Sequence, residues 1–425
     1  MSRLARADLA AHLAERVFAP AAAAPSAPAS SARGHVGVEA ELLATEASTG
    51  RPCPLERTTD GEVALLPFLR RFGAAQGWVE QRTSKGAPCF HVPGGGVLCF
   101  EPGGQLEYAT PPRNSASLLI DATRAVVQPL VAAADAEGIA LLSVGIDPFN
   151  PVERAPLQVQ ADRYTRMAEH FAQIGPAGAR MMRQTAAFQV NLDFGAVPRA
   201  RWQLLNALAP WVTAMFANSR MYEGTDSGHC SYRAHCWRTL DPRRTGLPFD
   251  QRQPVERYLE FALGAPAILL PAVQGEYRSF RHWLRTASPS LHEWEAHLTT
   301  LFPDVRPRGH LEMRACDAVD SAWYPAPLAF LTGLCYEPRA LHAALELLPA
   351  PSPELLERAG RFGMAEPTIA GLAGDLVDLA LAGCAALGPD FFDPAHLEEA
   401  GAFFDRYTRR GRSPADDLAD AAVAV

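Results

Sequence analysis

Alternating apolar and polar residues predict several β-strands in the N-terminal and central parts of the chain. Residues 36–45 alternate in this way, and their polar members Glu39 and Glu41 lie two positions apart, so both point to one strand face. Residues 184–194 and 310–315 follow the same pattern. The sequence therefore predicts strands that are apolar on one face and carry functional groups on the other.

Other segments complete the predicted architecture. Residues 97–110 predict two strands joined by a Pro-Gly-Gly turn, and residues 139–146 predict an apolar strand. Helical periodicity covers the following segments: 3–18, 63–76, 115–137, 201–218, and 325 to the C-terminus with breaks near 349–353 and 388–394. Because strands and helices do not alternate regularly, we expect an α+β fold with a mainly antiparallel sheet rather than a doubly wound parallel sheet.

The chain divides into three predicted regions. Residues 20–34 are rich in Ala, Pro and Ser, which is typical of a flexible linker. We expect an N-terminal helix and linker over residues 1–34, a catalytic domain over 35–345, and a helical C-terminal region over 346–425 that packs on the same domain.

The amino-acid composition excludes several classes of protein. The 425 residues are 48% hydrophobic, and 39 Lys+Arg against 47 Asp+Glu give a net charge of −8. This balance excludes wholesale disorder and argues against nucleic acid or an anionic membrane as the main partner. The 8 cysteines form no Cys-x-x-Cys pair, and no signal peptide or membrane span is predicted, so we expect a reduced, cytoplasmic protein.

Carboxylates on predicted strands are the first candidates for chemistry. Glu39 and Glu41 share a face, Glu101 and Glu107 flank the Pro-Gly-Gly turn, and Glu312 lies beside Arg314. Clustered carboxylates repel one another unless water, arginines or divalent cations compensate them. Mg²⁺ binds one or two carboxylates together with substrate phosphates, so such a set suits metal-bound nucleotide. The alternative is that each group lies on a solvated sheet surface.

Two further groups carry weaker signals. Thr185, Gln189 and Asn191 offer neutral donors and acceptors, or they form an ordinary outward sheet face. In residues 227–237, two His and two Cys allow a zinc interpretation, but adjacent His-Cys pairs cannot easily surround one tetrahedral ion. Arg233 in the same segment is suited to binding a substrate carboxylate, unless it is a plain surface arginine. The chain lacks P-loop, dinucleotide-binding, zinc-protease and serine-hydrolase motifs.

Several of these segments together resemble plant-type glutamate–cysteine ligases. The similar blocks occur in the family's order and span roughly residues 37 to 317. They are Glu101-Pro-Gly-Gly-Gln-Leu-Glu107 with Pro111-Pro112, the block from Met181 to Phe194, Phe216-Ala-Asn218-Ser219, Arg233-x-x-x-Trp237, Asp241-Pro-Arg243-Arg244-Thr245-Gly246, and His310-Leu-Glu312-Met-Arg314-x-x-Asp317.

The resemblance implies a glutamine-synthetase-like catalytic sheet, ATP and Mg²⁺. It also implies that γ-glutamylcysteine forms from L-glutamate and L-cysteine through a γ-glutamyl phosphate, for glutathione or ergothioneine biosynthesis. By motif, Glu39, Glu41, Glu101, Glu107 and Glu312 become metal ligands. Arg314, which also contacts the nucleotide, and Glu41 become catalytic residues. Arg233 becomes the ligand of the glutamate α-carboxylate, with Gln189, Asn191 and Thr185 as further substrate contacts.

Two alternatives remain open. A related ligase can use another amine acceptor in a specialised pathway, and a silent homologue can bind nucleotide or amino acid without turnover. The expected partners are small molecules only, with no nucleic acid or membrane, and the expected state is a monomer or homodimer.

Overall fold

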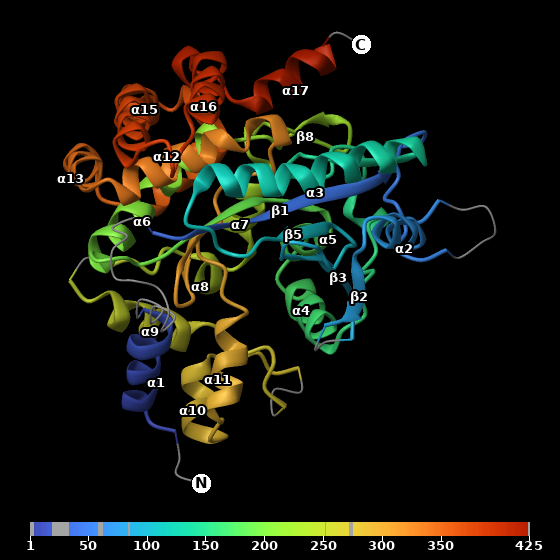
Figure 1. Cartoon of the computed structure of the whole chain (residues 1–425). Coiled ribbons are helices and arrows are strands. Elements are labelled where there is room, and N and C mark those ends of the chain that lie inside the picture. The colour runs from blue at the N-terminus through green and yellow to red at the C-terminus, as the bar shows by residue number, and fades with distance from the viewer. Residues whose placement is uncertain are drawn as a thin grey trace.

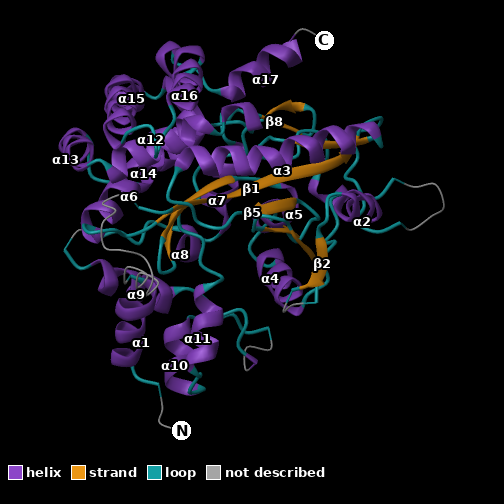
Figure 2. Ribbon diagram, viewed as in Figure 1, coloured by secondary structure: helices purple, strands orange, loops and turns teal. Residues whose placement is uncertain are grey.

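The computed structural model describes residues 4–18, 34–57, 63–83, 86–250, 252–271 and 275–423. Figure 1 shows a central sheet with helices on both sides, and Figure 2 shows how much of the molecule is helical. Most of the predicted linker falls on residues 19–33, which lie outside the described residues.

The strands belong to one large sheet and one short hairpin. Within the described residues the large sheet has nine strands, in the order β10-β11-β7-β1-β5-β4-β3-β2, with β6 also paired to β1. The strand pairings are antiparallel, as predicted. The strands are β1 (Val36–Glu46), β2 (Val79–Arg82), β3 (Pro88–His91), β4 (Val97–Phe100), β5 (Leu106–Ala109), β6 (Ile139–Leu142), β7 (Phe188–Leu192), β8 (Met221–Tyr222), β9 (Thr225–Asp226), β10 (Val305–Pro307) and β11 (Leu311–Met313).

The helices surround this sheet. In chain order they are α1 (Arg6–His12), α2 (Leu65–Ala75), α3 (Ala116–Ala136), α4 (Asp162–Ala172), α5 (Ala177–Gln184), α6 (Pro198–Met215), α7 (Tyr232–Leu240), α8 (Pro242–Thr245), α9 (Pro254–Gly264), α10 (Phe280–Thr286), α11 (Leu291–Leu298), α12 (Pro325–Tyr336), α13 (Pro338–Leu347), α14 (Pro353–Phe362), α15 (Pro367–Leu387), α16 (Pro394–Arg406) and α17 (Pro414–Val423). In Figure 1, α3 runs beside β1, α15 to α17 gather at the top, and α1 lies with α9 to α11 at the bottom.

The two faces of β1 have different surroundings. Val38 and Ala40 are buried in the main core, which also contains Phe188 of β7, Leu376 of α15 and Phe403 of α16. The sheet and the C-terminal helices therefore share one continuous core. The predicted boundary at residue 346 is not a break in packing, and the domain division stays a prediction. The opposite face of β1 carries Glu39 and Glu41, as the alternation predicts.

Some predicted bounds differ from those observed. The prediction of a strand over 184–194 is wrong at its start, because α5 continues to Gln184 and β7 begins only at Phe188. The predicted helix over 3–18 is α1 followed by a π-helical turn, Leu13–Val17. The elements that were not predicted have apolar residues that are too few or too irregularly spaced. They are β2, β3, β8, β9, β10, α4, α5 and α7 to α11.

Two described helices, α3 and α15, are long and apolar enough to cross a membrane by length and composition. Buried positions make up 44% of this apolar stretch in α3 and 39% in α15. Arg124 of α3 forms an ion pair with Glu399 of α16, and α15 packs along α12. Both helices thus have the contacts of helices that pack on a protein core, and they carry no argument for a membrane.

Candidate active site

A cavity of about 350 Å³ opens on the face of the sheet that carries Glu39 and Glu41. Strands β1, β5, β7 and β10 contribute side chains to it, together with α4, α5, α7 and the loops beside these elements. The turn between β4 and β5 closes one edge. A Cβ atom on Gly103 of this turn would lie 2.3 Å from the carbonyl oxygen of Arg183, so glycine allows the turn to pack directly on α5.

Four glutamates form what we call the acidic half of the cavity: Glu39, Glu41, Glu101 and Glu107. Glu41 on β1 lies directly opposite Glu107 on β5 in the antiparallel register. Glu101 follows β4, and its backbone N–H donates to the carbonyl of Gln105 across the turn. None of the four forms an ion pair with a residue in the described ranges. Arginines at longer range offset only part of the burial and repulsion that act on Glu39 and Glu41.

Burial and mutual repulsion raise the pKa of Glu39, Glu41 and Glu107 in the acidic half. Burial raises the pKa of the Glu41 carboxyl to about 7, and the neighbouring Glu101 adds to the shift. Burial, reinforced by Glu39 and Glu101, raises the pKa of Glu107 well above its usual range. Burial and the Glu312 carboxylate likewise raise the pKa of Glu39. These three carboxyls therefore ionise less readily than a solvent-exposed glutamate, and a positive charge nearby would favour their ionised form.

Buried amides separate these carboxylates from the positive charges. Gln189 of β7 donates from Nε2 to Oε1 of Glu41 at 2.7 Å, and its Oε1 accepts from Nη1 of Arg314 at 2.5 Å. Asn191 donates from Nδ2 to Oε1 of Glu39 at 3.3 Å, while its own Oδ1 is buried without a partner among the described residues. Gln189 thus links the acidic half to Arg314.

The opposite side of the cavity, which we call the arginine half, contains Arg306, Arg308 and Arg314 around Glu312. Arg306 donates to Glu312 from Nε at 2.6 Å and from Nη2 at 3.0 Å. Arg308 and Arg314 donate to it at 3.3 and 2.9 Å. Burial alone would raise the pKa of Glu312, but Arg306 and Arg314 outweigh it and hold this pKa below its usual range.

Arg233 enters the cavity from the first turn of α7. Its guanidinium carbon lies 4.6 Å from the centre of the Trp237 ring, and its Nη2 donates to the carbonyl of Arg314 at 2.9 Å. The Nε atoms of Arg233 and Arg314 are both buried, with no hydrogen-bond partner in the described part of the chain. Two buried cationic groups with free donors suit an anionic ligand.

The predicted site residues mostly share this cavity. Its lining includes Glu39, Glu41, Glu101, Glu107, Thr185, Gln189, Arg233 and Arg314. Thr185 faces it, and its Oγ1 also donates to the carbonyl of Met181. Asn191 and Glu312 lie behind the lining, in hydrogen-bonding contact with it. Both Glu312 oxygens already accept from arginines, so its metal role stays a prediction that these contacts do not favour.

Other lining residues were not predicted. Arg306 and Arg308 come from β10 and the turn after it, and Arg163 and Tyr164 come from α4. The signal that could have found the first two is their spacing: Arg306 and Arg308 are two apart, as are Glu312 and Arg314, with Gly309 between the pairs. Arg163 lies in a polar helix with nothing in its sequence to mark it.

The His/Cys segment does not assemble a zinc site. The rings of His229 and His235 lie 4.2 Å apart, but Cys236 is buried on the inner side of α7. Across the described ranges, no group of three or more His, Cys, Asp or Glu side chains is placed to hold a metal ion. The same holds for the acidic half: its four carboxylates line one cavity, but they do not surround a common point.

The donor set of the acidic half nevertheless fits hard divalent cations. It consists of carboxylate oxygens, with the amide oxygen of Asn191 unpaired nearby. Mg²⁺ favours oxygen ligands, and among the described residues no histidine lines the cavity to favour zinc. Burial and the neighbouring glutamates raise the pKa of Glu41 and Glu107, and a bound cation would oppose both by favouring the ionised form.

Comparisons with known proteins agree with this geometry. The model of glutamate–cysteine ligase family 2 matches residues 35–421. Glutamate–cysteine ligase EgtA of Mycolicibacterium smegmatis is 35% identical over 351 residues, covering 78% of this chain and 79% of that protein. The chloroplastic glutamate–cysteine ligase of Arabidopsis thaliana is 30% identical over 409 residues, covering 90% of this chain and 75% of that protein.

A solved structure supports the fold. Glutamate–cysteine ligase from Francisella tularensis, in complex with AMP, superposes with a TM-score of 0.55 at 11% identity, over 92% of this chain and 84% of that one. A likeness at this identity concerns the fold alone, and it agrees with the predicted α+β class. The family match and the two relatives identify this chain as a member of glutamate–cysteine ligase family 2.

Proposed function

We propose that this protein is an ATP- and Mg²⁺-dependent ligase that joins L-glutamate to L-cysteine through their γ-carboxyl and amino groups. The observation that carries the proposal is a single cavity in which four glutamates without an ion-pair partner among the described residues share the lining with Arg233 and Arg314, whose buried Nε atoms have no partner there. Such a cavity suits a substrate that brings both cations and anions, as a metal-bound nucleotide does.

The proposed reaction has two steps. The γ-carboxylate oxygen of glutamate attacks the γ-phosphorus of ATP, and ADP leaves. The amine nitrogen of cysteine then attacks the carbonyl carbon of the γ-glutamyl phosphate, a proton leaves the nitrogen, and phosphate departs. Both steps depend on positioning and charge compensation more than on a covalent protein group.

The residues of the cavity divide this work. Glu39, Glu41, Glu101 and Glu107 would hold Mg²⁺, which supplies charge neutralisation for the phosphate oxygens when it is bound. Arg314 would stabilise the negative charge on the transferring phosphoryl group, and Gln189 fixes Arg314 relative to Glu41. Arg233 would bind the α-carboxylate of glutamate, and Thr185 and Asn191 would contact substrate or its ligands.

The test is ADP release that depends on L-glutamate, L-cysteine and Mg²⁺ together. Replacing L-cysteine by other amines, with the product identified by its mass, separates a cysteine ligase from a ligase with another acceptor. Ligand-dependent thermal stabilisation without ADP from any amino acid pair would show a silent binding homologue. The proposal predicts ADP and γ-glutamylcysteine in equal amounts.

The relatives share the name of one reaction, whose product can serve more than one biosynthetic pathway. We propose that the product serves glutathione or ergothioneine formation in the cytoplasm. Detection of one of these thiols in cells, and its loss when the gene is deleted, would distinguish the two pathways. A monomer or homodimer is the expected state, and sedimentation velocity would measure it.

A further inference from the structure

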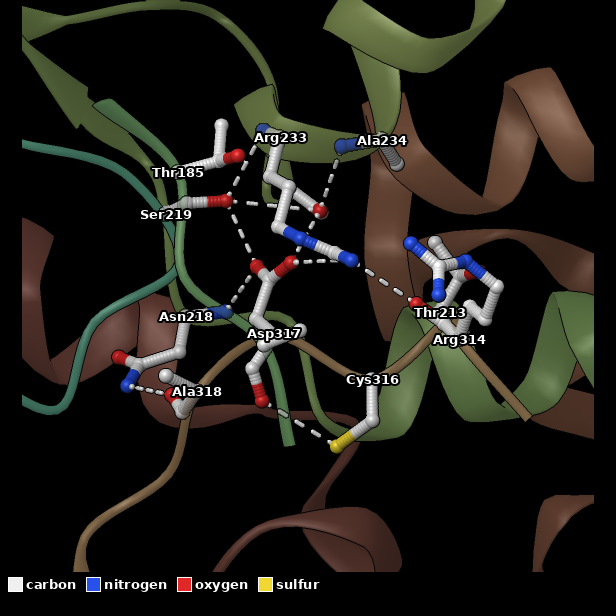
Figure 3. Close-up of polar contacts among 12 residues, drawn as sticks. Thr185, Thr213, Asn218, Ser219, Arg233, Ala234, Arg314, Cys316, Asp317 and Ala318 are labelled. Carbon is white, nitrogen blue, oxygen red and sulfur yellow. Dashed lines mark hydrogen bonds and ion pairs between the residues drawn. The ribbon is translucent and has the colours of Figure 1, made fainter. Parts of the chain in front are cut away.

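Asp317 is a buried carboxylate just behind the cavity, and Figure 3 shows how it lies among its partners. Its side chain is 1% exposed. Its Oδ2 accepts from the backbone N–H of Asn218 at 2.9 Å and from Oγ of Ser219 at 2.6 Å. Its Oδ1 accepts from Oγ of Ser231 at 3.0 Å. Three donors thus fix both oxygens.

The same two serines connect Asp317 to the start of α7. Oγ of Ser219 accepts from the backbone N–H of Arg233 at 3.1 Å, and Oγ of Ser231 caps α7 by accepting from Ala234 at 3.1 Å. Because Arg233 stands in the first turn of this helix, Asp317 holds the backbone from which the Arg233 side chain projects.

Asp317 also interacts with the Arg233 guanidinium directly. Its Oδ1 lies 3.6 Å from Nη1 of Arg233, which is itself 4% exposed. This distance is within reach of an ion pair but too long for a hydrogen bond, so the attraction orients the guanidinium without using its N–H donors. The unpaired Nε therefore stays available for a ligand.

The carboxylate has no room to move away. A Cβ atom on Gly145 would lie 2.5 Å from Cγ of Asp317, so the backbone there packs against the carboxylate. The backbone of Asp317 forms an antiparallel bridge with Ala187, just before β7. In the described part of the chain, Asp317 is the ion-pair partner of Arg233, while the other face of the guanidinium rests on Trp237.

From these contacts we propose that Asp317 is a positioning residue, which orients Arg233 to bind the α-carboxylate of L-glutamate. The inference rests on the proposed function and extends it, because Asp317 does not line the cavity and acts only through Arg233. Arg314 is held in the same unit, since its carbonyl accepts from Nη2 of Arg233.

The test is the steady-state kinetics of Asp317→Asn, which keeps the size of the side chain but removes its charge. We expect the KM for L-glutamate to rise roughly 10- to 100-fold, while the KM for ATP stays within about twofold. In Arg233→Lys the added Asp317→Asn change should have little further effect, since the two residues act as one unit. Independent, multiplying effects of the two changes would overturn the proposal.

Asp241→Asn is the matched control. Asp241 is a buried aspartate at the opposite end of α7, where it caps α8 and lies 3.8 Å from Nε of the buried Arg244. Its variant should lower the melting temperature and leave the KM for L-glutamate unchanged. If Asp317→Asn behaves like this control, Asp317 is merely structural and the proposal fails.

Two further measurements test the proposal if Asp317→Asn does not fold or if the wild-type protein releases no ADP. Should Asp317→Asn not fold, Ser219→Ala loosens the carboxylate but keeps its charge, and an unchanged KM for L-glutamate in that variant overturns the proposal. Should the wild-type protein release no ADP, the proposed function fails, and calorimetric binding of L-glutamate then tests Asp317 alone. Weaker binding by Asp317→Asn supports positioning, and equal binding or none by either protein contradicts it.

Discussion

The acidic half and the arginine half stand on one sheet face yet compensate their charges in opposite ways. Glu312 and the acidic half consist of the same residue type in one antiparallel sheet, where β7 lies between β11 and β1. Glu312 is surrounded by three arginines and has a lowered pKa, whereas Glu41 and Glu107 have no cationic partner among the described residues and have raised pKa values. In the arginine half the protein itself neutralises the carboxylate charge. In the acidic half we expect bound cations to do so.

This difference shows which carboxylates are available for ligands. Partly buried carboxylates without an ion pair reduce stability, so we attribute the retention of the acidic half to function. Gln189 contacts both halves, through Glu41 on one side and Arg314 on the other. The boundary between the two halves is therefore the place where we expect the phosphoryl group to be transferred.

Removal of one carboxylate from the acidic half should have the largest effect on activity. We expect Glu107→Gln to lower turnover roughly 100-fold or more, because the cavity loses a central ligand for cations. Its stability without Mg²⁺ should not fall, since the change relieves repulsion from Glu39 and Glu101. ADP release and urea unfolding measure the two effects, with the exposed Glu56→Gln as control. Activity like that of the wild type would remove Glu107 from the site.

The same substitution in the arginine half should act mainly on stability. Glu312→Gln leaves Arg306 and Arg314 buried without their carboxylate, and we expect the free energy of unfolding to fall by about 3 kcal/mol. Urea unfolding of Glu312→Gln and Glu107→Gln, both without Mg²⁺, compares the halves directly. Equal stabilities would mean that the two halves do not differ in the way described.

The buried His297, which lies outside both halves, makes the stability of the protein depend on pH. Burial and nearby Arg244 lower the pKa of His297 to about 3, so the folded protein keeps it neutral while the unfolded chain protonates near pH 6.5. The contribution of His297 to the free energy of unfolding is therefore fully present above pH 6.5 and is lost as the pH drops, by about 2 kcal/mol at pH 5. Unfolding at pH 7 and pH 5 should show a smaller fall in His297→Gln. An identical fall in that variant would contradict the assignment.

Cation binding without substrates should give the smallest effect. At a Mg²⁺ concentration of about ten times its dissociation constant, we expect the melting temperature to rise by about 1–2 °C. Glu107→Gln should lose this rise, and Glu56→Gln should keep it. Scanning calorimetry with and without Mg²⁺ makes the comparison. A rise of the same size in both variants would place the cations elsewhere.

The sequence predicts the acidic half better than the arginine half, for a physical reason. Strand alternation places Glu39 and Glu41 on one face, and a turn motif returns Glu107 beside them, so short-range patterns determine this part of the site. Arg306 and Arg308 belong to the short strand β10 and its turn, and their meeting with Glu312 depends on register rather than on periodicity. The sequence shows the charges there but not that they neutralise one another.

Long-range packing accounts for what the sequence did not predict. Gln184 lies in α5 because the helix continues past the point where apolar alternation begins, and alternation alone cannot separate the two. Arg163 reaches the cavity only because α4 packs against α5, a contact between segments with no shared motif. The role of Asp317 likewise depends on three segments that meet in the fold: 218–219, the start of α7 and the loop after β11.

The most direct test of the two-halves account is a crystal structure with Mn²⁺ and a non-hydrolysable ATP analogue, recorded with anomalous scattering from the metal. The account predicts manganese peaks among Glu39, Glu41, Glu101 and Glu107, with Glu312 still bound by its arginines. Peaks beside Glu312, or a nucleotide bound with no metal in the acidic half, would contradict it.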